Sequence, residues 1–156
     1  MTGFAPDNLD LDGKVILITG GTSGLGLSAA KQLVLQGARV AVFGRSQATL
    51  DAALAELGPT AIGLAADASQ PEAAALVIEA AVQKFGRLDA LYHVAGGSGR
   101  SKGDGPLHEL TDDGWRHTVD LNLSSVIYSN RAAVRQFLKQ GGGGVILNMG
   151  SVLGWS

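Results

Sequence analysis

A glycine-rich turn lies directly behind an apolar run near the start of the chain, over residues 19–26. Glycines let a backbone turn tightly and approach a phosphate without a Cβ in the way. The free N–H groups and the dipole at the start of a following helix attract negative charge. The sequence therefore predicts a site for a dinucleotide pyrophosphate, with candidate contacts at Gly20, Thr22, Ser23, Gly24, Leu25 and Gly26.

A second candidate group follows the next apolar run, which ends Val42-Phe43-Gly44-Arg45. Sites that select NAD place an acidic residue at this strand end to bind the ribose 2′-OH, and Gly44 stands there instead. A guanidinium such as that of Arg45 can bind a 2′-phosphate through two parallel hydrogen bonds. We therefore expect NADP as the cofactor, with NAD as the open alternative and a solvated loop charge as the other interpretation of Arg45.

The elements that must position these residues alternate between strands and helices. Such alternation predicts an α/β fold, a doubly wound (Rossmann-like) parallel sheet with ligands at the carboxyl ends of the strands. The predicted strands cover residues 15–19, 39–43, 61–66, 88–94 and 145–149. The predicted helices cover 24–36, 47–57, 71–85 and 111–139, with Ser46 and either Thr111 or Asp112 as N-caps and Pro71 as a first helical residue.

Length and composition narrow the function classes. The 156 residues correspond to one domain by length, and a net charge of −2 provides no basic field for nucleic acid. The absence of cysteine excludes disulfides and cysteine-based zinc sites, and we predict no metal site. No signal peptide and no apolar stretch of roughly 20 residues is visible, so we expect a cytoplasmic protein without membrane contact.

The spacing of the turn, with three residues between Gly20 and Gly24, resembles that of the short-chain dehydrogenases/reductases. The resemblance implies an oxidoreductase that transfers hydride between NAD(P)(H) and a small-molecule carbonyl or secondary alcohol. It also implies a homo-oligomer for a full-length enzyme. Ser23 stands where many NADP-binding members carry a basic residue, which is an argument against NADP.

Two further strand ends are similar to family cofactor segments. Asp67, followed by Ala68, resembles the family's aspartate that binds the adenine amino group; the other interpretation is a turn or N-cap carboxylate, and both roles can hold at once. Ala95 and Gly96 match the end of the family's Asn-Asn-Ala-Gly segment, whose small residues pass beside the adenosine ribose. His93 and Val94 replace the two asparagines, and we expect a structural role for His93 at the strand end.

The resemblance also implies two active-site residues. Asn122, within Val119-Asp120-Leu121-Asn122, falls on the family's active-site asparagine, which suggests a water-mediated proton relay. The flanking leucines and valines suggest that Asn122 lies on a buried face, and the alternative is a solvent-facing polar residue. Ser151 falls on the catalytic serine, which binds the substrate oxygen, and Ser156 is a weaker candidate.

The resemblance breaks at the family's Tyr-x-x-x-Lys element. The only tyrosines are Tyr92 and Tyr128, and Gly96 and Ala132 stand four residues after them. We therefore expect residues 1–156 to form one NAD(P)-binding domain that is incomplete at its C-terminus, a fragment without activity on its own. The alternative is a non-catalytic dinucleotide-binding module.

Overall fold

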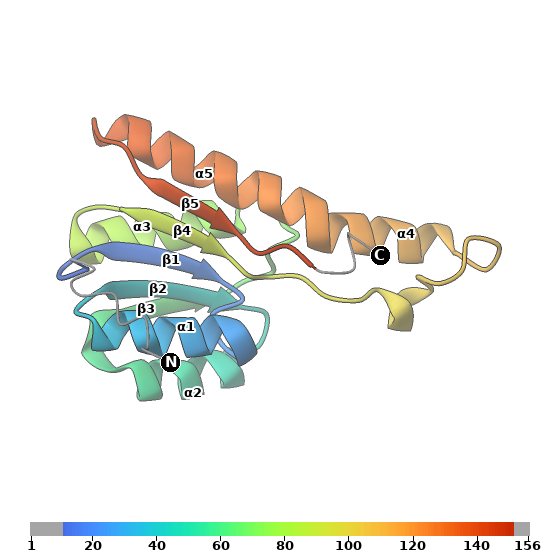
Figure 1. Cartoon of the computed structure of the whole chain (residues 1–156), viewed down its shortest axis with the longest axis horizontal. Helices are drawn as coiled ribbons and strands as arrows, with labels where there is room; N and C mark the ends of the chain where they lie inside the picture. The colour runs from blue at the N-terminus through green and yellow to red at the C-terminus, as the bar shows by residue number, and fades with distance from the viewer. Residues whose placement is uncertain (1–10, 152–156) are drawn as a thin grey trace, which may run out of the picture.

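The computed structural model describes residues 11–151, so residues 1–10, where no signal peptide was recognised, and Ser156 lie outside the described part. A five-stranded parallel sheet runs in the order β3-β2-β1-β4-β5 (Figure 1). Its strands are β1 (Val15–Thr19), β2 (Arg39–Gly44), β3 (Ala61–Ala65), β4 (Ala90–His93) and β5 (Val145–Asn148). The helices are α1 (Gly24–Leu35), α2 (Gln47–Leu57), α3 (Ala73–Phe85), α4 (Asp112–Val119) and α5 (Ser125–Lys139). Short helical segments are η1 (Gly58–Thr60), η2 (Arg100–Lys102) and η3 (Asp120–Ser124). The predicted α/β architecture is confirmed.

Strand β1 is buried on both faces, which explains its continuous apolar sequence. Val15 and Leu17 pack into a core cluster with residues of α3 and α5. Ile16 and Ile18 point the opposite way, into a cluster with residues of α1 and α2. Figure 1 shows these two helix pairs on opposite sides of the sheet. The alternation of side chains along a strand thus divides the core into two layers.

The predicted helix over residues 111–139 is present as α4, η3 and α5 in direct succession. Thr111 is the N-cap, and its hydroxyl accepts a hydrogen bond from the Gly114 N–H at 3.0 Å. The middle part, η3, is a π-helical turn, a distortion that often occurs at functional sites. In Figure 1, α4 extends beyond the carboxyl ends of the strands, so η3 lies near the edge where ligands are expected.

The start of α3 corrects one prediction, because Pro71 is not a helical residue. The helix begins at Ala73, and two successive turns precede it, with Gln70 N–H donating to the Asp67 carbonyl and Ala73 N–H donating to the Gln70 carbonyl. The Asp67 side chain also accepts from the Ser69 N–H, at 3.0 Å. These local bonds hold the chain in turns and delay the helix.

Strand β5 occupies one edge of the sheet and pairs with β4. Gly144 precedes it, and a Cβ at this position would lie 2.3 Å from the ring of Phe137 on α5. A glycine here therefore lets the chain pass the aromatic ring and enter the sheet. Val145 and Leu147 of β5 are exposed within the described residues.

Candidate functional site: a cleft at the carboxyl ends of the strands

The glycine turn joins β1 to α1 and needs glycine at each of its three spaced positions. Gly20 and Gly24 have φ angles of +67° and +51°, in the left-handed region that side chains disfavour. A Cβ on Gly26 would lie 2.2 Å from the Gly20 carbonyl oxygen, so the helix can approach the turn only without one. The side chain of Ser23, the N-cap of α1, makes no capping hydrogen bond. The first N–H groups of α1 are thus available to an anion.

A cleft of about 420 Å³ opens beside this turn. It brings together the ends of β1, β2, β3 and β4, as expected for an open parallel sheet. All of the predicted cofactor-binding residues line it, namely Gly20, Thr22, Ser23, Gly24, Leu25, Gly26, Arg45, Asp67, Ala68, Ala95 and Gly96. A cradle of glycines that a Cβ would fill, at the start of a helix, fits a bound pyrophosphate.

At the end of β2, Gly44 packs against Thr22 of the glycine turn. A Cβ on Gly44 would lie 2.3 Å from Thr22 Oγ1, which itself accepts a hydrogen bond from the Thr49 hydroxyl at 3.4 Å. An acidic side chain therefore cannot stand at position 44 without displacing Thr22. The next residue, Arg45, is exposed and forms no ion pair with any of residues 11–151.

At the end of β3, Asp67 serves the local turn as well as lining the cleft. Its Oδ1 accepts hydrogen bonds from the Ser69 N–H at 3.0 Å and from the Ser69 hydroxyl at 2.9 Å. The predicted role of Asp67 as a turn carboxylate is therefore confirmed, and it is compatible with a cofactor contact. A turn bond at one oxygen fixes the carboxylate at the rim of the cleft.

Thr19 links the ends of β1 and β4 and was not among the predicted site residues. The side chain is fully buried, and its Oγ1 accepts from the N–H groups of Val94 and Ala95, both at 3.0 Å. This hydroxyl holds the wall of the cleft in place where the β4 ladder ends. A lone hydroxyl residue at the end of an apolar strand was the available signal.

Asn122 lies in η3, and its expected burial is wrong: the side chain is exposed. It is nevertheless fully engaged with backbone, because Oδ1 accepts from the Gly97 N–H at 2.9 Å. Its Nδ2 donates to the carbonyls of Gly97 and Thr118, both at 2.9 Å. The flanking apolar residues were a poor guide because the π-helical turn changes which residues face the sheet. Asn122 thus ties the segment after β4 to the long helix.

A second cleft, of about 1220 Å³, adjoins this segment. Both predicted active-site residues, Asn122 and Ser151, line it. Its other walls come from residues of the loop between β4 and α4, including Arg100, Asp104 and Glu109. Asp104 is held by the Thr118 hydroxyl, which donates to Oδ2 at 2.9 Å. Gly96 of the first cleft and Gly97 of the second are adjacent in the chain, so the two clefts meet there.

His93, at the end of β4, is buried behind the first cleft and does not line it. Its ring nitrogens contact Ser129 of α5 and the carbonyl of Ala95. Burial lowers the pKa of His93 below its usual value, and the hydrogen bond to the Ala95 carbonyl opposes that shift. The expected structural role at the strand end is confirmed.

A comparison with protein families decides the classification. The model of the short chain dehydrogenase family matches residues 14–156. The chain belongs to this family. A 3beta-hydroxysteroid dehydrogenase 2 from Eggerthella lenta is 35% identical over 153 residues, which cover 96% of this chain and 58% of that protein.

Other family members show the same likeness. A (5R,7aS)-5-hydroxy-7a-methyl-1-oxo-2,3,5,6,7,7a-hexahydro-1H-indene-carboxyl-CoA reductase from Mycobacterium tuberculosis is 34% identical, covering 93% of this chain and 56% of that protein. A crystal structure of a short chain dehydrogenase from Mycobacterium smegmatis has a TM-score of 0.85 and 34% identity, over 94% of this chain and 60% of that one. NAD⁺-bound xylitol dehydrogenase has a TM-score of 0.84 and 25% identity, over 94% and 56%.

The chain spans about half the length of the relatives that it matches, 56% and 58% for the two enzymes from Mycobacterium tuberculosis and Eggerthella lenta. The family consists of NAD(P)-using oxidoreductases, and the described part of this chain has the family's fold. Of the helices within residues 11–151, none has the length and apolar character that crossing a bilayer requires.

Proposed function

We propose that this chain binds a nicotinamide dinucleotide in the cleft beside the glycine turn and forms the cofactor half of a carbonyl reductase or alcohol dehydrogenase. The observation that carries the proposal is the convergence of four strand ends and their predicted contacts on one glycine-lined cleft. When bound, the nicotinamide supplies or accepts the hydride. The chain's own residues bind the pyrophosphate, hold the ribose beside Ala95 and Gly96, and orient the ring toward the second cleft.

The preferred cofactor in this proposal is NADP. The close contact between Gly44 and Thr22 supports it, because it disfavours an acidic residue for the 2′-OH. The exposed guanidinium of Arg45 lies at the cleft and is not paired within the described residues. A 2′-phosphate would gain a charge-assisted hydrogen bond there.

Titration of the protein with NADPH and with NADH tests this choice. Arg45→Ala should weaken NADPH binding about tenfold, the loss of one charge-assisted hydrogen bond, and leave NADH binding unchanged. Arg135→Ala is a suitable control, because this exposed arginine on α5 lies away from the cleft. Tighter binding of NADH than NADPH by the unmodified protein would contradict the NADP proposal.

The second cleft is the proposed substrate site. Ser151 and Asn122 line it together, which supports a role for Ser151 in binding the substrate oxygen and for Asn122 in ordering water. The bonds of Asn122 to Gly97 place the polar residue at the junction of the two clefts. A small carbonyl or secondary alcohol in this cleft would lie beside the nicotinamide.

Turnover by these 156 residues is not expected, because neither tyrosine is followed four residues later by a lysine that could lower its pKa. The measurement is NADPH oxidation by the purified chain with a panel of ketones. Activity above the level of a Ser151→Ala control would overturn the expectation.

A non-catalytic dinucleotide-binding role is the second candidate. It is favoured by one feature: the predicted cofactor contacts all lie within this chain, whereas the Tyr-x-x-x-Lys element does not. Saturable cofactor binding at micromolar concentration without turnover would support it. Turnover would exclude it.

A further inference from the structure

His93 connects two elements that build the cofactor cleft. It is the last residue of β4, and its side chain is 1% exposed. Nδ1 lies 2.7 Å from the Ser129 hydroxyl on α5, and Nε2 lies 3.0 Å from the carbonyl oxygen of Ala95. One buried ring therefore joins α5 to the segment that follows β4.

The partners of the ring determine its tautomer. A carbonyl oxygen only accepts, so the nitrogen facing Ala95 must carry the hydrogen and donate it. Nδ1 of the neutral ring then has a lone pair, which faces the Ser129 hydroxyl at 2.7 Å; the single hydrogen of that hydroxyl is shared among Nδ1 and the carbonyls of Ser125 and Val126, at 2.9 and 3.1 Å. The Ala95 carbonyl therefore fixes the neutral ring in the tautomer that carries its hydrogen on Nε2.

Nε2 of His93 also lies close to Ser125, whose hydroxyl bonds to a residue that lines the cofactor cleft. The Ser125 hydroxyl is 3.3 Å from Nε2 and donates to the Leu121 carbonyl at 2.6 Å. Leu121 lines the cofactor cleft, and the adjacent Asn122 binds both backbone groups of Gly97. Residues 95–97 are thus fixed at one end by His93 and at the other by Asn122.

We propose that His93 is a positioning residue, whose Nε2–H fixes the Ala95 carbonyl and with it this wall of the cofactor cleft. It acts through the Ala95 backbone and touches no ligand itself, since it does not line the cleft. This inference rests on the proposed function, because the wall that His93 positions is the proposed contact for the ribose. Its hydrogen bonds can be tested separately.

Two substitutions, each of which retains one of the ring's two hydrogen bonds, distinguish the roles of Nδ1 and Nε2. The amide of a glutamine can place a donor near the position of Nε2, within reach of the Ala95 carbonyl. The shorter asparagine can place an acceptor only near Nδ1, within reach of Ser129. His93→Gln therefore keeps the bond to the cleft wall, whereas His93→Asn keeps the bond to α5.

The first measurement is the Kd for NADPH of the wild type and both variants. His93→Asn should raise the Kd about three- to tenfold, which corresponds to the loss of one net hydrogen bond, and His93→Gln by less than about twofold. Ser129→Ala is the matched control: it removes the bond at Nδ1, so it should lower the melting temperature with little change in Kd. Equal effects of the Asn and Gln variants on Kd would overturn the proposal.

The second measurement needs neither a variant nor a cofactor. Imidazole ¹⁵N chemical shifts of the wild type should show His93 as the neutral tautomer protonated at Nε2. A ring protonated at Nδ1 alone would overturn the proposal.

Hydrogen exchange separates this inference from the proposed function. The amides of Ala95 and Gly97, bound to Thr19 and Asn122, should exchange faster in His93→Asn than in His93→Gln. If the wild type binds neither NADPH nor NADH, the proposed function fails, and the exchange rates still decide the role of His93. Equal rates in the two variants would refute it.

Discussion

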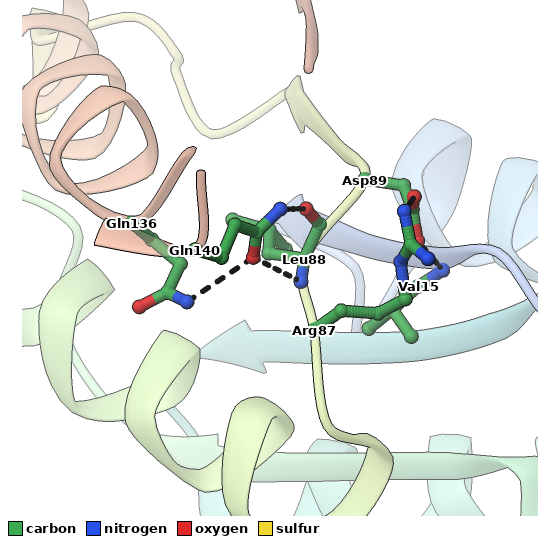
Figure 2. Close-up of polar contacts among 6 residues, drawn as sticks. All are labelled: Val15, Arg87, Leu88, Asp89, Gln136 and Gln140. Carbon is green, nitrogen blue, oxygen red and sulfur yellow. Dashed lines mark hydrogen bonds and ion pairs between the residues drawn. The ribbon is translucent and has the colours of Figure 1, made fainter. Parts of the chain in front are cut away.

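At the amino end of the sheet, side chains form hydrogen bonds with the backbone of the strands and of the segments beside them. At the carboxyl end, the backbone lines a cleft. Figure 2 shows the amino end, where the Gln140 side chain binds both backbone groups of Leu88. Its Nε2 donates to the Leu88 carbonyl at 2.7 Å, and its Oε1 accepts from the Leu88 N–H at 3.1 Å. Gln136, one turn earlier, donates to the same Oε1 at 3.1 Å. The end of α5 is thereby attached to the chain just before β4.

At the same end, a carboxylate joins the neighbouring strands β1 and β4. Asp89 Oδ2 accepts from the Val15 N–H at 2.9 Å, and Oδ1 pairs with Arg87 at 2.6 Å (Figure 2). The bond to Val15 crosses from the residue before β4 to the first residue of β1. The amino end thus satisfies its backbone groups internally and leaves none of these for a ligand.

The carboxyl end uses side-chain-to-backbone bonds differently. Thr19 and Asn122 fix the cleft wall from behind, while the glycine turn leaves the first N–H groups of α1 uncapped by Ser23. We infer that the two ends have different roles: the hydrogen bonds at the amino end stabilise the fold, and the geometry of the carboxyl end determines the affinity for a ligand. Substitutions at the two ends should therefore affect different measurements.

The largest expected effect is that of Gly26→Ala at the carboxyl end. Its Cβ would lie 2.2 Å from the Gly20 carbonyl, so the turn and α1 must separate, at a cost of about 3 kcal/mol in the free energy of unfolding. The displaced helix start should also abolish measurable NADPH binding. Calorimetric titration and urea denaturation measure the two effects.

Gly24→Ala is the matched control for that prediction. A Cβ there meets nothing within 4 Å, but the φ of +51° makes an alanine strained by about 1 kcal/mol. A loss of stability at Gly24 as large as at Gly26 would contradict the close-packing explanation.

Asp89→Ala should be the strongest substitution at the amino end. It removes the acceptor for the Val15 N–H, and leaving a donor unsatisfied costs about 2 kcal/mol. NADPH affinity at the opposite end should stay unchanged. Asp89→Asn retains an acceptor oxygen and should cost less than about 1 kcal/mol, because the lost ion pair involves a half-exposed Arg87. A change in Kd with either variant would break the proposed division.

Gln140→Ala should have a smaller effect of the same kind. Both hydrogen bonds to Leu88 disappear, which should lower the free energy of unfolding by about 1.5 kcal/mol. Gln136→Ala removes only the outer bond to Gln140 and should cost about 0.5 kcal/mol. Equal costs would mean that the Leu88 clamp is not the stabilising contact.

The sequence predicted the carboxyl end better than the amino end, for a physical reason. Gly20, Gly24 and Gly26 follow one another closely, so their function can be recognised within a single turn. Leu88 and Gln140 are 52 residues apart, and nothing local in either indicates that they meet. The same reason explains why Thr19 was missed, since its partners come from the distant end of β4.

Asn122 shows a different limit. Its place in the site agrees with the resemblance, but its exposure was wrongly predicted from a regular helical pattern. The π-helical turn η3 interrupts that pattern, and none of its residue types indicates a π-helix in the sequence. Its hydrogen bonds to Gly97 depend on a loop whose path the sequence does not define.

The smallest expected effect is a pH dependence of stability caused by His93. Burial lowers the pKa of His93 in the folded protein below 6.5, so between pH 6.5 and that lower value the unfolded chain binds a proton that the folded protein excludes. The free energy of unfolding should therefore fall as the pH decreases from 6.5 and level off below the folded pKa. His93→Gln should remove this component in urea denaturation between pH 7.5 and 5, whereas a change at the exposed His108, His108→Gln, should retain it. An unchanged pH slope in His93→Gln would show that another group titrates, and that the buried ring behind the cleft is protonated as readily as in the unfolded chain.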